Sequence, residues 1–443
     1  MATASSTLPV SVPARSVSHG AGFWIAAASF LVVMAYSTVP TPLWSLYQQR
    51  DGFSTFDITI AFAVYAVGVV TSLFLVGHLG DTLGRRRILL PAIALEIVSA
   101  VIFIVWPEFG GLIAARVVSG LGIGMLTATV TAHILDLHLK SRPGADPARG
   151  QIVSGAANLG GFGAGALVSG LLARWIAMPL VTPFAVFLVL LVLAFAAIVL
   201  VPETAVRPAV RPAYRPQRMR VPRQSRGRFF LAGGIAFAAF SVLGLFASLA
   251  PVFLSGQLHS TSLATAGVVV FIAFAAAALS QIAVRPLSTR TQVALGTVLL
   301  VAGIAVLAVV VVTVSGLGFF VVGGIVSGAG AGPLFKAALA VAGSLAKAAN
   351  RGEVLAGIFL IGYIGLTVPV VGIGVATLSV SLAAALVGFA AVIIAVALLT
   401  AIPLLAGLGA VSRLPVQKEK VAIDRSPDVR VAVPPLAAIP PTV

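Results

Sequence analysis

One short segment, Gly77–Leu89, combines residue types that can form strong polar contacts between helices. It contains one acid, Asp81, a run of three arginines and three glycines. A carboxylate can accept hydrogen bonds from a helix amino terminus or from an arginine, and glycines allow a tight turn and a close approach of helices. This composition predicts a loop that latches helices together through Gly77, Gly80, Asp81, Gly84, Arg85 and Arg86. Alternatively, the arginines only anchor the loop at a membrane surface.

Two ionisable residues lie inside long apolar stretches. A buried arginine costs at least about 2.5 kcal/mol in a bilayer, so Arg116 should face a cavity or a partner; alternatively, its side chain extends to water. Glu96 is a candidate functional residue because acids inside spans are rare, although it could be protonated in lipid or packed against a neighbour. At 1.5 Å per residue, Glu96 lies about 12 Å and Arg116 about 25 Å from the same membrane face. A direct ion pair between them is therefore not expected.

Three further polar residues are candidates for a cavity. Lys336 places a cation in the half of its helix nearest the arginine-rich loops, where it either faces a cavity or extends to water. Asn158, in a glycine-rich stretch, contacts a substrate or forms an interhelical hydrogen bond. Tyr36 belongs to a polar group near the end of the apolar run 22–46, which contains no acid.

The composition indicates which elements must hold these residues. The chain has 443 residues, of which 59% are hydrophobic and only 9% are charged. Soluble proteins have about 25% charged residues, so an integral membrane protein is predicted. A span needs about 20 mostly apolar residues, and twelve such stretches are present: 22–46, 56–76, 88–106, 111–135, 150–173, 179–201, 228–254, 261–284, 291–313, 316–341, 353–377 and 380–406.

Positive charge is distributed unevenly along the chain. The net charge is +16, yet eight arginines lie between residues 207 and 228, and most other Lys and Arg residues lie in alternate short loops. This is the positive-inside pattern of a membrane protein, so no nucleic-acid partner is expected and both termini are assigned to the cytoplasm. The expected division is a cytoplasmic tail (1–20), a bundle (21–201), a Pro- and Arg-rich cytoplasmic linker (202–227), a second bundle (228–406) and a disordered cytoplasmic tail (407–443).

An internal repeat supports two similar halves. Val118-Ser119-Gly120-Leu121-Gly122-Ile123-Gly124 reappears as Val326-Ser327-Gly328-Ala329-Gly330-Ala331-Gly332, and Arg149-Gly150 with Gly160 matches Arg351-Gly352 with Gly362. Parallel repeats of this kind occur in transporter folds. Because small residues let helices touch closely, we expect helix-packing roles for Gly120, Gly124, Gly160, Gly165, Gly328 and Gly332.

The pattern Gly77-x-Leu79-x-Asp81-x-x-Gly84-Arg85-Arg86 closely resembles the signature loop between helices 2 and 3 of the major facilitator superfamily. The Arg116 to Gly124 segment, Pro202-Glu203-Thr204 and the repeat are also similar to that family. The resemblance covers about residues 20–406. It implies an all-α membrane protein with twelve transmembrane helices in two pseudo-symmetric six-helix bundles, in which Asp81 and Arg85 brace the outward-facing state. It also implies coupling or cavity roles for Arg116, Lys336, Asn158, Tyr36 and Glu96.

The same resemblance implies a secondary transporter that moves a small molecule by alternating access. The pattern is closest to bacterial drug or metabolite proton antiporters, which suggests proton-driven efflux by a monomer in a bacterial inner membrane, without cofactor or metal. The glycine-rich stretch Gly155–Gly170 is similar to the antiporter motif but lacks its Gly-Pro core. Since helix 1 has no acid, and Arg116 and Lys336 are the expected cavity charges, a neutral or anionic amphipathic substrate is expected.

Two other functions compete with efflux. A proton-coupled uptake symporter for a small metabolite would share every motif described above. A membrane receptor or enzyme is disfavoured, because the sequence has no Walker-type nucleotide loop, no Ser/His/Asp or metal-ligand set and no soluble catalytic segment.

Overall fold

The computed structural model describes residues 16–205, 214–217, 223–256, 262–313, 316–346 and 351–411. Within these ranges the secondary structure is helical: α1 (His19–Tyr36), η1 (Thr41–Leu43), α2 (Trp44–Asp51), α3 (Thr55–Leu75), α4 (Gly80–Leu83), α5 (Arg85–Val105), α6 (Phe109–Ser141), α7 (Ala148–Trp175), α8 (Thr182–Leu200), η2 (Arg223–Ser225), α9 (Arg226–Ser248), α10 (Ala250–Gly256), α11 (Leu263–Ala283), α12 (Thr289–Thr313), α13 (Leu317–Leu345), α14 (Arg351–Ala376) and α15 (Leu382–Val411).

Twelve helical segments of the described residues are long and apolar enough to cross a membrane, and the first of them comprises α1, η1 and α2. This confirms the predicted all-α fold with twelve spans. Most of the two tails and of the linker expected from the sequence lies outside the described residues.

Local signals explain where helices begin. Ser54 precedes α3, and its hydroxyl accepts a hydrogen bond from the backbone of Asp57, while the Asp57 carboxylate accepts one from the Ser54 backbone at 2.8 Å. This reciprocal pair is a capping box, which satisfies two N–H groups that the helix itself cannot bond. Between α4 and α5 the chain turns at Gly84, whose φ of 109° is rarely adopted by other residues.

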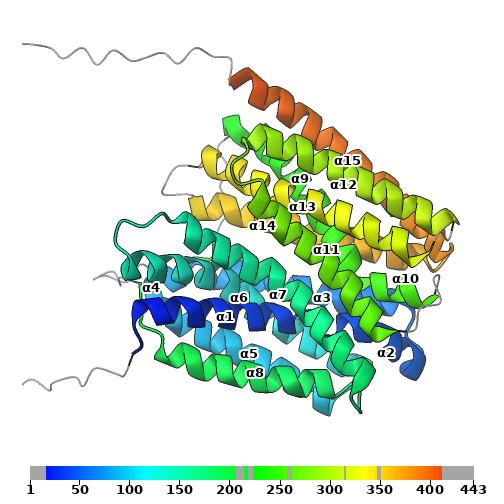
Figure 1. Cartoon of the computed structure of the whole chain (residues 1–443), viewed down its shortest axis with the longest axis horizontal. Coiled ribbons are helices and arrows are strands. Elements are labelled where there is room, and N and C mark those ends of the chain that lie inside the picture. Colours follow the sequence, from blue (N-terminus) through cyan, green and yellow to red (C-terminus); the bar gives the residue numbers. More distant parts are fainter. Residues whose placement is uncertain are drawn as a thin grey trace, which may run out of the picture.

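The first half of the molecule contains α1–α8 and the second half contains α9–α15 (Figure 1). The halves pack together through two helix pairs, α7 with α11 and α3 with α14. The α7–α11 contact depends on glycines, because a Cβ on Gly163 would lie 3.2 Å from Phe271 and a Cβ on Gly170 would meet Leu263 and Gly267 of α11. The glycine-rich stretch predicted in the fifth span therefore lies where the halves meet.

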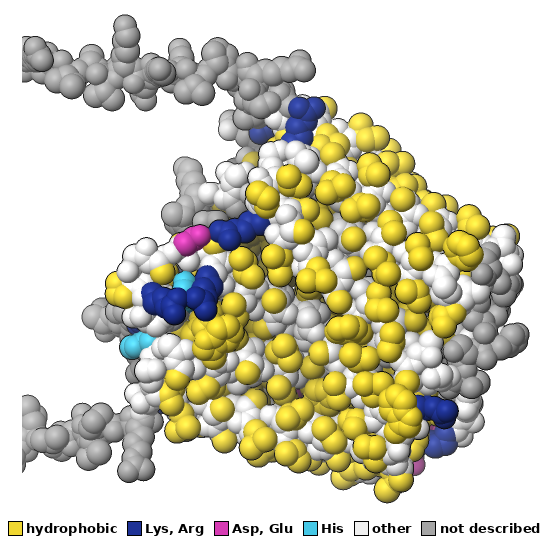
Figure 2. Space-filling view, in the orientation of Figure 1, with side chains coloured by type: hydrophobic (Ala, Val, Ile, Leu, Met, Phe, Trp, Pro, Cys, Tyr) yellow, Lys and Arg dark blue, Asp and Glu magenta, His cyan; other side chains and the backbone are white. Residues whose placement is uncertain are grey.

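The two ends of the bundle differ in charge. We call the end with loops 76–84, 142–147 and 201–205 the basic face and the other end the opposite face. Figure 2 shows Lys and Arg side chains gathered mainly at the left end, with hydrophobic side chains across the middle. The described ends of α1 and α15 both lie at this left end in Figure 1. At the opposite face the halves touch where the Thr41 hydroxyl donates to the carbonyl of Ala247 at 2.8 Å and where Thr59 packs on Gly374.

The repeated glycines support equivalent helix pairs in the two halves. In the first half, Gly120 and Gly124 of α6 lie against the backbone of α3. In the second half, Gly328 and Gly332 of α13 lie in the same way against α11. A side chain at any of these positions would collide with the neighbouring helix, so the helix-packing role expected for all four glycines agrees with their surroundings.

A short described piece of the linker is fastened to the first half. The backbone N–H of Gln217 donates to the carbonyl of Phe74 at 2.9 Å, and the Tyr214 hydroxyl donates to the carbonyl of Leu75 at 3.0 Å. These carbonyls end α3, where no intrahelical donors remain. The Gln217 side chain also approaches Gly352, at the start of α14.

Candidate functional site

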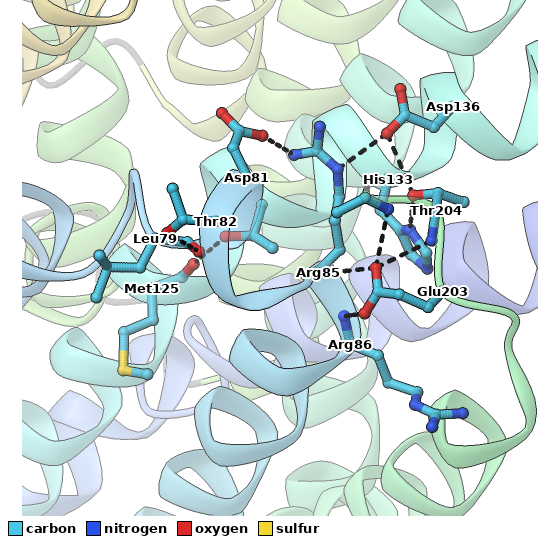
Figure 3. A network of polar contacts seen from close by, with 12 residues as sticks. Leu79, Asp81, Thr82, Arg85, Arg86, Met125, His133, Asp136, Glu203 and Thr204 are labelled. Atoms are coloured by element: carbon cyan, nitrogen blue, oxygen red, sulfur yellow. Dashed lines mark hydrogen bonds and ion pairs between the residues drawn. The ribbon is translucent and has the colours of Figure 1, made fainter. Parts of the chain in front are cut away.

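The first polar group of interest lies at the basic face and involves Arg85, at the start of α5. Its guanidinium pairs with Asp81 at 2.9 Å and with Asp136 of α6 at 2.9 Å (Figure 3). The side chain of Asp81 is 71% exposed, whereas that of Arg85 is 13% exposed. The sequence allowed Asp81 to bond either a helix amino terminus or an arginine, and in this structure it pairs with an arginine.

The amino terminus of α5 is instead bonded by Glu203, which follows α8. The two carboxylate oxygens of Glu203 accept the backbone N–H groups of Arg85 at 2.9 Å and Arg86 at 3.1 Å. The residue before α5 is Gly84, which has no side chain to cap the helix. Glu203 therefore supplies a capping group from a distant part of the sequence and neutralises the positive end of the helix dipole.

Glu203 also accepts hydrogen bonds from the backbone of Thr204 at 2.9 Å and Ala205 at 3.0 Å. Burial opposes ionisation of this half-buried carboxyl, but the four backbone donors outweigh burial and hold its pKa below the ordinary value. Glu203 is accordingly an ionised, firmly bonded group at neutral pH.

Thr204 connects the remaining members of this network. Its hydroxyl lies 2.8 Å from Nδ1 of His133 and donates to Asp136 at 3.2 Å, while its carbonyl accepts a hydrogen bond from Lys140 at 2.8 Å. We call the whole set the basic-face network: Asp81, Arg85, Arg86, His133, Asp136, Lys140, Glu203 and Thr204. It joins the signature loop, the end of α6 and the end of α8, and an open hollow of about 340 Å³ lies beside it.

The glycines of the signature loop have separate roles in the same region. Gly84 provides the positive φ between α4 and α5. A Cβ on Gly80 would lie 2.9 Å from the Thr129 side chain of α6, and a Cβ on Gly77 would lie 2.7 Å from the carbonyl of Leu73. All three positions thus favour glycine, either for conformation or for close contact.

The second polar group lies inside the first half, around Arg116 of α6. Arg116 is only 3% exposed, so it does not extend to water. Its guanidinium donates to the carbonyls of Ser37 at 2.8 Å and Ala61 at 3.3 Å, and lies 4.2 Å from the centroid of the Tyr65 ring. No carboxylate of the described residues lies within ion-pair distance of Arg116. The positive charge is held by dipoles and an aromatic face, which leaves it able to attract an anion.

Tyr36 lies beside this arginine at the end of α1. Its hydroxyl is 2.8 Å from the Ser99 hydroxyl, which in turn donates to the carbonyl of Ala115 at 2.8 Å. Since Ser99 has only one hydrogen to give, Tyr36 is the donor in the first bond. The Tyr36 ring is 1% exposed, so this residue is part of the bundle interior in this conformation.

Glu96 of α5 is completely buried and faces α6. A Cβ on Gly122 would touch its Oε1 atom, so the absence of a side chain there makes room for the carboxyl group. Of the two structural alternatives for Glu96, packing against a neighbouring helix agrees with this position and exposure to lipid does not. As expected, it forms no ion pair with Arg116, although the two side chains are close enough to interact electrostatically. We call Tyr36, Tyr65, Glu96, Ser99, Arg116 and Ser119 the core polar cluster.

An aromatic cluster in the second half was not predicted from the sequence. Phe240 of α9 lies 4.8 Å from Phe335 of α13 and 5.8 Å from Tyr363 of α14, and Phe335 lies 5.7 Å from Phe359 of α14, all between ring centroids. Tyr363 lies near Tyr65 across the α3–α14 contact. The cluster therefore adjoins the core polar cluster. Phenylalanines occur throughout the apolar spans, so the positions of these four rings in the sequence do not indicate that they meet.

Lys336 and Asn158 have different surroundings. Lys336 donates to the carbonyl of Gln281 at 3.1 Å, in the last turn of α11, where carbonyls lack helical partners. This contact agrees with a local role near the basic face rather than with a cavity cation. Asn158 lies one turn before Phe162, whose ring stacks on Phe274 of α11 at 5.4 Å. No hydrogen bond joins the Asn158 side chain to another described residue, so the interhelical bond considered for it is not formed here.

Two predicted packing glycines in α7 also differ. A Cβ on Gly165 would collide with the Ala35 carbonyl of α1. No atom lies within 4 Å of the position of a Cβ on Gly160. In this conformation no described residue outside its own helix packs closely on Gly160, so its packing role remains a prediction.

The sequence was compared with protein families and with individual known proteins, and the matches agree with the helical membrane fold described above. Residues 25–368 match the Major Facilitator Superfamily. The chain is 30% identical over 159 residues to the uncharacterized MFS-type transporter Rv1250 of Mycobacterium tuberculosis, covering 34% of this chain and 27% of that protein. It is 33% identical over 97 residues to the multidrug transporter mfsC of Aspergillus fumigatus, covering 22% and 18%. The matched regions thus span less than a third of either relative.

A crystal structure of the nucleoside transporter NupG has a similar fold. The match has a TM-score of 0.65 and covers 87% of this chain and 99% of NupG. The sequences are 12% identical, so the similarity concerns the fold alone.

Proposed function

Since this chain belongs to the major facilitator superfamily, we propose that it carries a small molecule across a membrane by alternating access, driven by protons. The observation that carries this proposal is the arrangement of two repeat-related halves whose most extensive contacts are two helix pairs, α3 with α14 and α7 with α11. Such halves can rock about a site between them, which is the movement that alternating access requires. No cofactor or metal enters this proposal.

The arginine distribution supports an orientation for this movement. With the basic face in the cytoplasm, both ends of the chain lie inside, as the positive-inside rule favours. The contacts between Thr41 and Ala247 and between Thr59 and Gly374 then close the outer side. We assign the protein to a bacterial inner membrane and treat it as a monomer.

Two neighbouring groups support a neutral or anionic amphipathic substrate. Arg116 supplies a buried positive charge without a carboxylate partner among the described residues. The aromatic cluster of Phe240, Phe335, Phe359 and Tyr363 supplies flat apolar surface from the other half. A molecule with an apolar face and an anionic or hydrogen-bond-accepting end matches both groups, because aromatic rings favour the first and arginine the second.

We propose efflux as the direction, in line with the multidrug name of one relative. Uptake by a proton symporter is the alternative, because a symporter of this family would share the same motifs and the same fold. Growth of a strain with and without the gene, on a panel of toxic acids, neutral amphipaths and lipophilic cations, tests the substrate class. Protection against cations but not against acids or neutral compounds would contradict the proposal.

Direction is tested separately in everted membrane vesicles with an imposed proton gradient, acidic inside, and the compound found by the panel. Antiport predicts accumulation inside these vesicles, and collapse of the gradient should abolish it. Accumulation only in right-side-out vesicles that are acidic outside would establish the symporter instead. Insensitivity to the gradient in both preparations would refute proton coupling.

A further inference from the structure

Glu96 is the one carboxylate residue among the buried polar residues of the described chain, with 0% of its surface exposed. It lies in the middle of α5, which crosses the membrane. Neither carboxylate oxygen has a hydrogen-bond partner in the described structure, and the hydroxyl of neighbouring Ser119 is likewise unbonded. An ionised carboxylate in such surroundings would carry a large solvation penalty, whereas a neutral carboxylic acid carries a much smaller one.

The internal symmetry provides a comparison within the same molecule. In the first half, Gly122 of α6 packs on Ala92 and Glu96 of α5. In the second half, the equivalent glycine, Gly330 of α13, packs on Gly296 and Leu300 of α12. Leu300 therefore holds the place that Glu96 holds in the first half. Because a leucine stands at the equivalent position, the corresponding helix pair of the second half packs without an acid there.

The titratable surroundings of Glu96 are few. Arg116 of α6, Tyr36 of α1 and Tyr65 of α3 are the titratable groups near it. Helix α8, which also packs on α5, contains no titratable residue. Among the described residues, Arg116 is thus the only nearby group that can compensate a negative charge on Glu96. Its guanidinium is bonded here to the carbonyls of Ser37 and Ala61.

We propose that Glu96 is the proton-binding site of this transporter, neutral in the described conformation and ionised in the alternative one. An O–H bond forms on one carboxylate oxygen when the proton binds, and the proton returns to water when the bond breaks. The ionised form is stabilised when rearrangement of α5 and α6 brings Arg116 and water to the carboxylate. This assignment deepens the proposed function, because it names the group through which the proton gradient acts.

Infrared spectroscopy of the purified full-length protein in lipid nanodiscs tests the neutral state directly. At pH 7, the spectrum of the wild type minus that of Glu96→Gln should contain the carbonyl stretch of one protonated carboxylic acid. The variant Glu96→Leu copies the residue found at Leu300, so it should fold and give the same difference. A spectrum in which no protonated carboxyl band is lost on substitution would overturn the proposal.

Conformational coupling is tested with a cysteine reporter, which the absence of natural cysteine makes specific. Thr59 is buried against Gly374 at the opposite face, so Thr59→Cys should react with a water-soluble maleimide only when that face opens. Cysteine ionisation itself raises the rate with pH, so the readout is the ratio of rates in the Glu96 and Glu96→Gln backgrounds.

The ratio of maleimide reaction rates in the two backgrounds should change with pH by up to about tenfold per pH unit, the limit for one coupled proton. A ratio of rates that stays constant from pH 5 to 9 would overturn the proposal. Glu108→Gln removes an acid outside the core polar cluster, before α6, and should keep the pH response.

These experiments separate the assignment from the proposed function. If the infrared band and the pH response are present but transport ignores the proton gradient, Glu96 remains a proton site and proton-driven transport is refuted. If transport in vesicles is proton-driven and unchanged in Glu96→Gln, the assignment to Glu96 is refuted and the proposed function stands.

Discussion

At the scale of single residues, the basic-face network combines contacts of two kinds. Glu203 accepts four backbone N–H groups and is half-buried, so its bonds hold the ends of α5 and α8 together. Asp81 pairs with Arg85 through a largely exposed carboxylate, and ion pairs open to solvent contribute only about 0–1 kcal/mol. The first contact is therefore expected to govern stability, whereas the second is free to change between conformations.

Replacing Glu203 by Gln should lower the free energy of unfolding by about 1 kcal/mol, the usual contribution of a helix-capping group. The pH dependence has a defined sign, because the pKa of Glu203 in the folded protein lies below its ordinary value. The negative charge of Glu203 stabilises the folded protein fully above a pH of about 4.5, the ordinary pKa of a glutamate. This stabilisation is lost as the pH falls through the lower pKa that Glu203 has in the folded protein. Thermal unfolding of wild type and variant should thus differ at pH 7 and converge in acid.

Glu108→Gln provides a matched control for that measurement. Glu108 precedes α6 but makes no capping hydrogen bond with its side chain. Its replacement should leave the unfolding temperature almost unchanged at both pH values. An equal loss of stability in both variants would attribute the effect to net charge rather than to capping.

Asp81→Asn should slow transport while leaving the unfolding temperature nearly constant, since Arg85 keeps its bond to Asp136. The comparison is with Asp136→Ala, which removes the acceptor of both Arg85 and Thr204 and should lower stability as well. Initial transport rates at matched amounts of inserted protein provide the measurement. Unchanged rates in Asp81→Asn would refute a conformational role for the signature acid.

At the scale of helices, α7 packs closely both on a helix of its own half and on a helix of the other half. One face carries Gly161 and Gly165 against α1, and another carries Gly163 and Gly170 against α11. Close contact on two faces lets α7 transmit movement from its own half to the other. The sequence predicted a glycine-rich packing helix, but the faces could not be assigned because almost every glycine in such a stretch fits a packing pattern.

Gly165→Ala and Gly160→Ala form a matched pair on this helix. The first places a methyl group against the Ala35 carbonyl and should cost about 1–3 kcal/mol or prevent folding, because backbone cannot move aside easily. The second points into open space and should be neutral or stabilising by about 0.5 kcal/mol. Yield and unfolding temperature in detergent distinguish them, and equal behaviour would contradict the packing described for α7.

At the scale of the whole molecule, the twelve spans could be predicted because each needs only length and hydropathy. The signature loop was recognisable because its glycines and charges are close in sequence. Glu203 is recognisable in the sequence only as part of Pro202-Glu203-Thr204, because its partners Arg85 and Arg86 lie more than a hundred residues away. The aromatic cluster was missed for the same physical reason, since α9, α13 and α14 come together only in the folded bundle.

One ion pair crosses between the halves at the basic face. Arg285 of the second half lies 3.0 Å from Asp146 of the first, and both side chains are largely exposed. Asp146→Asn or Arg285→Gln should favour opening at this face by no more than about fivefold, since exposed pairs contribute at most about 1 kcal/mol. The Thr59→Cys reporter should then react more slowly, because both faces do not open together. The charge-swapped double variant should restore the rate, and failure to do so would exclude this pair as a gate.

The attachment of Tyr214 and Gln217 to the end of α3 has a mechanical consequence. A linker attached to the two halves only at its own ends would simply become shorter or longer between those ends if the halves moved. Here, the described residues 214–217 are hydrogen-bonded to α3, which contacts α14 of the other half. If the halves separate as proposed, α3 would either carry these residues along or lose their bonds at Phe74 and Leu75. This attachment would therefore add to the free energy needed to separate α3 from α14.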